Sequence, residues 1–272
     1  MKFARVFPTR TSMSPTDPDA YFGEPDLFTP IYDKVLVSIT FTWDKEKGIA
    51  LAKKWKRHGD VSIGGVAIDG ESLAPFRPGE FLRYGITITS RGCPNYCDFC
   101  MVRHGRIIEY SFIPEGNIVQ DNNLLACSNH HLGFVWEMLK GQKAIELKGG
   151  LESSRITPKI AETLRGLRIK SLWLACDVHG AIKPLQKAVE LLTKAGFTRN
   201  HLFCYVLCGK NMAEEEDRLK TVFNMGCMPF AQLYRNEKDD IKYSKEWKNF
   251  ARDWSRPAQT KWIMKNNIHF PR

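Results

Sequence analysis

The sequence has no long apolar segment and no secretion signal. No uninterrupted apolar run approaches the roughly 18–20 residues that a membrane-spanning helix needs. The first ten residues, MKFARVFPTR, carry charge but are not followed by the apolar stretch of a signal peptide. We therefore expect a cytoplasmic protein that has no contact with a membrane.

Cysteine is absent from the first 92 residues, and only three of the eight cysteines that follow are clustered. In a cytoplasmic chain of this length, eight cysteines indicate metal or redox chemistry more often than a disulfide framework. The cluster has the spacing C-x₃-C-x₂-C and consists of Cys93, Cys97 and Cys100. Common protein metal sites have four ligands, so the fourth ligand has to come from elsewhere. The remaining cysteines form no ligand motif: Cys127, Cys176, Cys204, Cys208 and Cys227.

Acidic residues are outnumbered by basic ones, 30 to 40, which gives a formal net charge of +10. Because Lys and Arg neutralise phosphates, this excess favours a polyanionic partner such as a nucleic acid. Many basic proteins bind no nucleic acid, so charge alone does not establish one. The arginines around the cysteine cluster are Arg83, Arg91, Arg103 and Arg106.

Residues 1–80 are expected to form a separate N-terminal part. Residues 1–30 are rich in Pro, Thr, Ser and Asp, which predicts an irregular arm. A β-branched run over 34–43, a helical pattern over 45–59 and a second apolar run over 61–68 then predict a β-α-β segment. This segment is too small to be a complete nucleotide-binding domain.

Strands and helices alternate over residues 81–235, which indicates an α/β fold. Six strands are predicted at 84–90, 116–125, 143–150, 170–177, 201–209 and 228–235. Such alternation favours parallel pairing with right-handed crossovers, in a barrel, a partial barrel or an open sheet. In these folds chemistry collects at the carboxyl ends of the strands, and the cysteine cluster follows the first strand. Residues 236–272 contain three regularly spaced tryptophans and are predicted to form a helical tail.

Two kinds of metal centre are compatible with the cysteine cluster. Zinc could take the three thiolates and His104, which stands four residues after Cys100. An iron–sulfur cube could instead use the three thiolates and leave one iron open to an exogenous ligand.

The loop SRGCPNYCDFC, with Phe99 just before the third cysteine, resembles the signature of the radical S-adenosylmethionine (SAM) superfamily. The resemblance covers roughly residues 80–235 and implies a partial (β/α)₆ TIM-like barrel. In that family three cysteinates hold a [4Fe–4S] cluster whose open iron binds SAM. Reductive cleavage of SAM then yields a 5′-deoxyadenosyl radical that abstracts hydrogen from the substrate. As a whole, the chain is similar to short radical SAM proteins of bacteria and phages.

The resemblance also implies which residues contact SAM. Residues after the second and third strands match positions that hold its amino and carboxylate groups, and later strand ends match the ribose and adenine positions. Ordinary structural roles, such as an Asx turn, a surface salt bridge or a helix N-cap, remain alternatives. The implied contacts are Phe99, Asp121, Asn122, Asn123, Glu152, Arg155, Asp177, Gly209 and Tyr234.

The region before residue 80 resembles the second half of a cobalamin-binding domain. Ser38-Ile39-Thr40 and Gly64-Gly65 fit the Ser-x-Leu…Gly-Gly separation of that domain. The histidine that ligates cobalt is missing from the 37 residues before Ser38. We therefore expect a truncated segment that serves structure and binds no cobalamin.

Cys176 and Cys208 fall at the carboxyl ends of the fourth and fifth predicted strands. A thiol at that position could act in catalysis by donating hydrogen to a product radical. The commoner role of a buried cysteine is that of a small hydrophobe.

Together these features predict a radical SAM oxidoreductase or transferase that is reduced by a flavodoxin or ferredoxin. The basic charge favours a nucleic acid or a modified nucleotide as its substrate. A peptide or a small metabolite is the alternative within the same class. A protein of another class would use the Cys₃His zinc site to stabilise a nucleic-acid-binding fold without catalysis.

Overall fold

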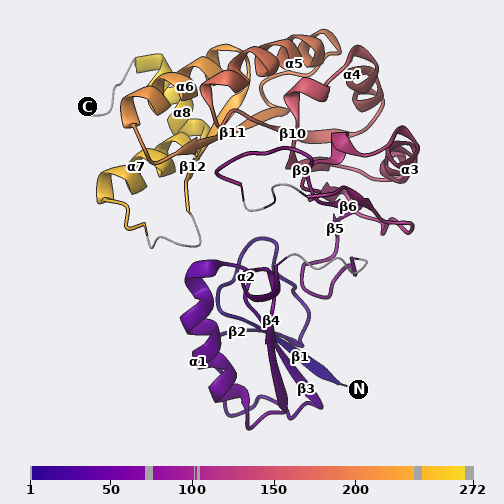
Figure 1. Cartoon of the computed structure of the whole chain (residues 1–272), viewed down its shortest axis with the longest axis vertical. Coiled ribbons are helices and arrows are strands. Elements are labelled where there is room, and N and C mark those ends of the chain that lie inside the picture. The colour runs from indigo at the N-terminus through magenta and orange to yellow at the C-terminus, as the bar shows by residue number, and fades with distance from the viewer. Residues whose placement is uncertain (1, 71–75, 101, 103–104, 236–240, 267–272) are drawn as a thin grey trace. The chain divides into compact units, whose positions relative to one another are not determined.

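A computed structural model describes residues 2–70, 76–100, 102, 105–235 and 241–266 of the chain. The chain divides into two compact units, Met1–Ile86 and Thr87–Arg272. Each unit is built on its own parallel sheet with helices in the connections (Figure 1). The predicted α/β class is therefore confirmed.

The first unit contains a four-stranded parallel sheet in the order β2-β1-β3-β4. Its strands are β1 (Phe3–Phe7), β2 (Ala20–Phe22), β3 (Lys34–Ser38) and β4 (Asp60–Gly64). After the short turn η1 (Thr42–Asp44), helix α1 (Lys45–Trp55) connects β3 to β4, and α2 (Val66–Asp69) follows β4. The core of this unit includes Val35, Val37, Ile39, Leu51 and Trp55, so α1 is held by its apolar face.

The prediction of an irregular arm over residues 1–30 is wrong at its start. Residues Phe3–Phe7 form β1, which lies between β2 and β3 and buries Ala4 and Val6. The guanidinium of Arg5 is also buried, where it donates to the backbone oxygen of Gly79 at 2.7 Å and pairs with Asp17. A five-residue strand with a charged residue at its centre does not show the usual alternation of apolar and polar residues.

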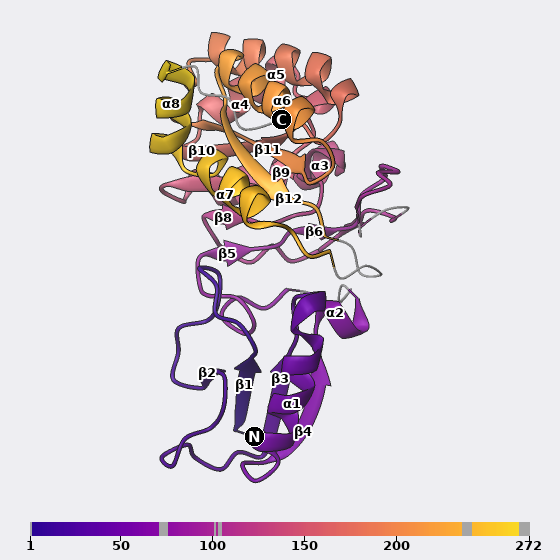
Figure 2. The same cartoon turned by 90° about the vertical axis from the view of Figure 1, so that its left-hand side faces the viewer.

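The second unit contains a six-stranded sheet in the order β12-β11-β10-β9-β8-β5. The strands are β5 (Ile86–Thr87), β8 (Ile118–Val119), β9 (Ile145–Leu151), β10 (Ile169–Ala175), β11 (Leu202–Cys208) and β12 (Met228–Leu233). Strands β8 to β12 pair in parallel in chain order. The connecting helices are α3 (Asn129–Lys140), α4 (Pro158–Arg165), α5 (Ile182–Lys194) and α6 (Met212–Asn224). Helices α4, α5 and α6 lie together in Figure 2, as expected when parallel strands that follow chain order are joined by crossovers of one hand.

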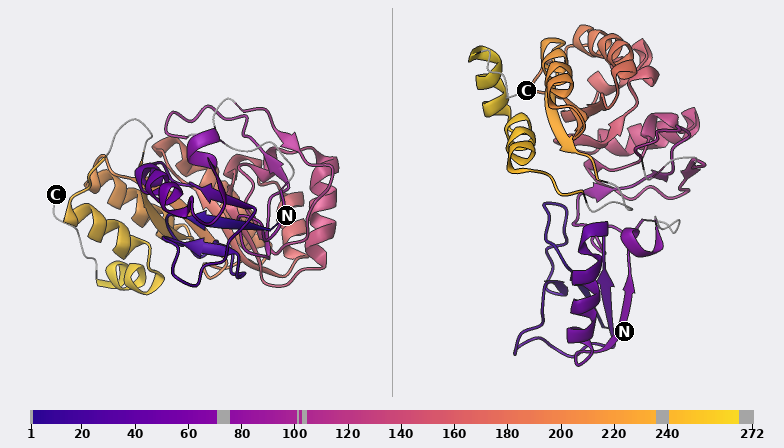
Figure 3. Two further views of the ribbon diagram at one scale, coloured as in Figure 1. Left: turned by 90° about the horizontal axis from the view of Figure 1, so that it is seen from below. Right: turned by 60° about the vertical axis from the view of Figure 1, so that its left-hand side comes forward.

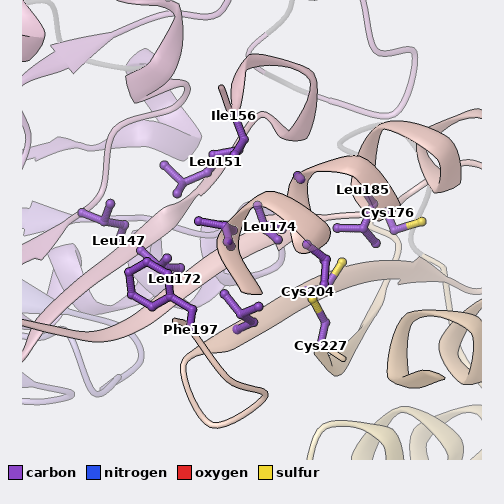
Figure 4. Close-up of a cluster of buried hydrophobic side chains, with 14 of the residues drawn as sticks. Leu147, Leu151, Ile156, Leu172, Leu174, Cys176, Leu185, Phe197, Cys204 and Cys227 are labelled. Carbon is purple, nitrogen blue, oxygen red and sulfur yellow. The ribbon is translucent and has the colours of Figure 1, made fainter. Parts of the chain in front are cut away.

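The two faces of this sheet differ in what covers them. On β11, Leu202, Cys204, Val206 and Cys208 are buried in the core with residues of α5 and α6, while the residues between them are only half-buried. Figure 4 shows Cys176, Cys204 and Cys227 among the leucines of this core. The alternation places the core on the helix side of the strands, as the pleat of a sheet requires.

The tail after β12 forms two helices, α7 (Lys245–Trp254) and α8 (Pro257–Asn266). Helix α7 packs against β12, and both helices lie beside that end of the sheet in the views of Figure 3. Trp254 is fully buried whereas Trp262 is 52% exposed, so the tail tryptophans do not share one packed face. No helix in the described part of the chain is long and apolar enough to cross a membrane.

Candidate metal and cofactor site

The cysteine loop spans residues 92–107 and is closed by a small hairpin. Strands β6 (Ser90–Arg91) and β7 (Ile108–Glu109) pair antiparallel at its base. Gly92 has a φ of +90°, and a Cβ there would lie 2.1 Å from the backbone oxygen of Arg106, so only glycine fits. The amide of Gly92 donates to Asn122 Oδ1 at 2.9 Å. The start of the loop is therefore fastened to the segment that follows β8.

The three cysteines of the loop are free thiols, and each is partly exposed. Burial raises the pKa of Cys97, and the negative charges of Cys100 and Cys93 raise it further, followed by those of Asp177 and Glu152. The amide of Cys100 donates to the oxygen of Cys97 at 3.0 Å, which makes the turn between them. These negative charges and burial oppose ionisation of Cys97, so a bound cation would favour its thiolate form.

Glu152, directly after β9, joins the cysteine loop to the strand ends. Its Oε2 accepts hydrogen bonds from Asn123 at 2.7 Å, Arg155 at 2.9 Å and Asn95 at 3.1 Å, and its Oε1 accepts one from Ser154 at 2.6 Å. Burial by itself would raise the pKa of Glu152, but these hydrogen bonds outweigh burial and lower it to about 2. Glu152 is therefore a fixed negative charge beside the thiols at any pH near neutral.

Asn123 lies beside the cysteine loop and has one acceptor atom that is not used in a hydrogen bond within the described residues. Its Nδ2 donates to Glu152 and lies 3.5 Å from Cys93 Sγ. Its Oδ1 is buried and has no hydrogen-bond partner among the described residues. A buried acceptor without a partner costs about 1–3 kcal/mol, so such an atom marks a position where a donor from a bound group would be stabilising.

Asp121 is bonded to the residues that lead into the cysteine loop, and its contact with SAM stays a prediction. Its carboxylate is buried and accepts from Thr89 N at 2.7 Å, Thr89 Oγ1 at 2.6 Å and Ser90 Oγ at 2.6 Å. Asn122, through Gly92, likewise anchors the loop. The structure thus uses Asp121 and Asn122 to hold the residues leading into the cysteine loop, and leaves Asn123 beside the thiols.

Asp177 follows β10 and reaches the same region. It accepts a hydrogen bond from the amide of Leu207 at 3.0 Å, and its negative charge contributes to the raised pKa of Cys97. Burial raises the pKa of Asp177, and the Leu207 amide and the charge of Arg218 offset this only in part, which leaves the pKa at about 6. A partly desolvated carboxylate beside a loop of three cysteines is typical of functional sites.

We expect the substitution Asp177→Asn to stabilise the protein at neutral pH. The folded-state pKa of about 6 lies above the unfolded value of 3.8, so the carboxylate makes the wild type lose stability as the pH rises between these values. Asparagine does not titrate, and its Oδ1 can keep the Leu207 bond. Urea unfolding at pH 7.5 should show a gain of roughly 1–3 kcal/mol that disappears near pH 4. Asp217→Asn, on the exposed side of α6, is the control; a loss of stability in Asp177→Asn at pH 7.5 would contradict the expectation.

A side chain of the C-terminal tail lies against the residues that were predicted to contact adenine. Gly209 has a φ of +129°, and a Cβ there would lie 2.1 Å from the hydroxyl of Tyr243. That hydroxyl donates to the backbone oxygen of Tyr234 at 2.7 Å. The close approach expected at Gly209 is thus made by Tyr243, and an adenine contact of Gly209 or Tyr234 stays a prediction.

The other predicted residues take varied positions. Cys176 and Cys208 are buried in the core, away from solvent, and burial raises the pKa of Cys176 to about 11. Their packing is that of small hydrophobic residues, so hydrogen donation by either remains a prediction without support from its position. Phe99 is half-buried in the turn of the cysteine loop, and Arg155 is exposed and paired with Glu152. His104 lies outside the described residues.

Two residues of this region escaped the sequence reasoning. Asn95 lies within the cysteine loop, and its polar side chain between two predicted ligands was the available signal for its bond to Glu152. Tyr243 stands far beyond the last strand, and nothing in the sequence connects it with Gly209. No protein-family model matches the chain, and no curated protein is similar to it in sequence. What the site does is therefore inferred from its own residues.

Proposed function

We propose that the chain is a radical SAM enzyme in which Cys93, Cys97 and Cys100 hold a [4Fe–4S] cluster. The observation that carries the proposal is that the loop with these three thiols meets the ends of two strands: Asn95 of the loop donates to Glu152 at 3.1 Å, and the charge of Asp177 contributes to the raised pKa of Cys97. Each carboxylate comes from the carboxyl end of a different strand, so three parts of the chain meet at one edge of the sheet. That edge is where parallel α/β folds place their chemistry.

The donor set fits three corners of an iron–sulfur cube and one open iron. Three thiolates supply the protein ligands, and their partial exposure leaves room for an exogenous group. The unpaired Oδ1 of Asn123 and the ionised Glu152 suit the ammonium of SAM, whereas Arg155 suits its carboxylate. When bound, cluster and SAM supply the electron transfer that cleaves SAM to a 5′-deoxyadenosyl radical, which takes hydrogen from the substrate.

The residues of the chain position these groups. Glu152 holds Asn95 of the loop against Asn123, so the cysteines keep one arrangement relative to the strand ends. Asp177 would accept from a ribose hydroxyl through the oxygen that Leu207 leaves available. We also propose that the six-stranded sheet is a partial (β/α)₆ barrel, since its strands follow chain order and its helices connect successive strands.

We propose a nucleic acid or a modified nucleotide as the substrate, with a flavodoxin or ferredoxin as the electron donor. The net charge of +10 supports a phosphate-bearing partner. A peptide or a small metabolite is the alternative substrate class, and deuterium transfer from labelled candidates into 5′-deoxyadenosine distinguishes the classes.

The test is anaerobic incubation of iron- and sulfide-reconstituted protein with dithionite and SAM, followed by mass spectrometry for 5′-deoxyadenosine. We expect the nucleoside to form only when both reductant and iron are present. The substitution His104→Ala separates this proposal from the zinc site: iron stays bound if the cluster is correct. Loss of all metal in His104→Ala, or a fully iron-loaded protein that forms no 5′-deoxyadenosine, would contradict the proposal.

A further inference from the structure

A second group of ligand-type side chains lies away from the three cysteines of the loop. Asp121, Cys127 and His131 each offer a donor atom, and the three donor atoms lie within 4.8 Å of one another. All three residues are buried, with exposed fractions of 2%, 8% and 4%. A carboxylate, a thiol and an imidazole gathered at one buried place form the donor set of a transition-metal site.

The local fold brings the three together over a short stretch of chain. Asp121 stands just beyond β8, and Cys127 ends the turn η2 (Leu124–Ala126). His131 is in the first turn of α3, where Ser128 Oγ caps its amide at 3.2 Å. Cys127 and His131 are thus four residues apart across a fixed helix start, a spacing that zinc sites use.

The surrounding hydrogen bonds orient the donors. The single hydroxyl proton of Thr89 goes to Asp121 Oδ2 at 2.6 Å, so His131 Nε2, 3.1 Å from the same hydroxyl, must donate to it. Ser90 Oγ also donates to Asp121. Bonds of this kind hold carboxylate and imidazole ligands in place around bound metals.

Burial opposes ionisation of the thiol and the carboxyl at this place. It raises the pKa of the Cys127 thiol to about 11 and raises that of Asp121, and the carboxylate of Glu109 adds to the shift of Cys127. A divalent ion would stabilise the ionised thiolate and carboxylate in place of the solvent that burial excludes.

We propose that Asp121, Cys127 and His131 bind one divalent transition-metal ion of the zinc type in a structural site. Donors around tetrahedral zinc stand roughly 3.3–3.8 Å apart, so the side chains need to close by about 1 Å. Binding releases the thiol proton of Cys127, and the neutral imidazole of His131 binds the metal through the ring nitrogen that carries no proton, so it loses none. The ion would fasten α3 to the residues that lead into the cysteine loop.

The experiment uses untagged full-length protein carrying Cys93→Ala, Cys97→Ala and Cys100→Ala, so that no iron–sulfur cluster forms. After dialysis against Zn²⁺ or Co²⁺, metal is measured by mass spectrometry, and Co²⁺ is also followed by its thiolate charge-transfer absorption. We expect one equivalent per chain, with affinity at least tenfold weaker after Cys127→Ala or His131→Gln. Cys176→Ala, which removes another buried thiol, should bind normally. Glutamine at 131 keeps a donor for Thr89, and circular dichroism checks that each variant is folded.

Absence of a metal equivalent in the folded triple variant would overturn the proposal, whatever the further variants do. Binding that survives both Cys127→Ala and His131→Gln would overturn it as well. The site does not depend on the proposed radical SAM activity: failure to form 5′-deoxyadenosine leaves this result unchanged, and failure to bind zinc leaves the activity assay unchanged.

Discussion

Replacing Cys97 with alanine is expected to remove iron from the reconstituted protein and to reduce 5′-deoxyadenosine formation to background. The charges of both Cys100 and Cys93 contribute to the raised pKa of Cys97, which groups this thiol with the other two. Two thiolates leave two corners of a cube without protein ligands, and such a cluster is lost. Iron analysis and the anaerobic assay with dithionite and SAM measure the two effects.

The matched control is Cys227→Ala, which removes one thiol from the core and none from the loop. It should keep its iron and its activity, and should cost on the order of 1 kcal/mol of stability through the small cavity. Iron content equal to wild type in Cys97→Ala would rule out the ligand set. An equal loss of iron in Cys227→Ala would show that cluster binding follows stability rather than ligation.

Glu152→Ala is expected to weaken both iron retention and stability, whereas Glu152→Gln is expected to change mainly the binding of SAM. Alanine removes the acceptor that Asn95, Asn123 and Arg155 share, so the cysteine loop loses its link to the strand ends. Glutamine can keep its carbonyl oxygen at that position and turn its amide toward Ser154. It loses only the charge, and a charge-assisted bond to the SAM ammonium is worth about 2 kcal/mol, or roughly 30-fold in KM.

The wild type and Glu152→Gln are also expected to differ in how their stability depends on pH. The pKa of Glu152 is about 2 in the folded protein and 4.5 as its reference value, so its contribution to stability is present above pH 4.5 and is lost as the pH falls toward 2. The wild type should therefore lose more stability than Glu152→Gln between these values. Urea unfolding at pH 7 and pH 3 measures the difference.

The KM for SAM at full iron occupancy separates the two roles of Glu152. A raised KM in Glu152→Gln with normal iron content supports a contact with SAM. An unchanged KM with normal iron content would show that Glu152 only holds the loop. Lys140→Gln, which breaks the exposed ion pair with Glu137 on α3, is the surface control and should change neither quantity.

The strand and helix alternation of the second unit could be predicted because it is a local pattern. The strands with full seven-residue runs, such as Ile169–Ala175 and Leu202–Cys208, agree with the predicted ranges to within one or two residues. The strands next to the cysteine loop are much shorter than predicted, since Ile86–Thr87 and Ile118–Val119 each pair over only two residues. There the chain leaves the sheet early. Side-chain hydrogen bonds, such as those that Asp121 accepts from Thr89 and Ser90, take the place of backbone hydrogen bonds between the strands.

By itself the sequence determined the α/β alternation and the placement of three cysteines on one loop after a strand, because residue type and spacing along the chain suffice for both. Only the tertiary structure decided that Asp121 is enclosed, that Asn123 stands beside Cys93 and that Glu152 joins them. Neighbouring polar residues at a strand end look equivalent in sequence. Which of them turns inward depends on partners 30 or more residues away, and those partners meet only when the sheet has formed.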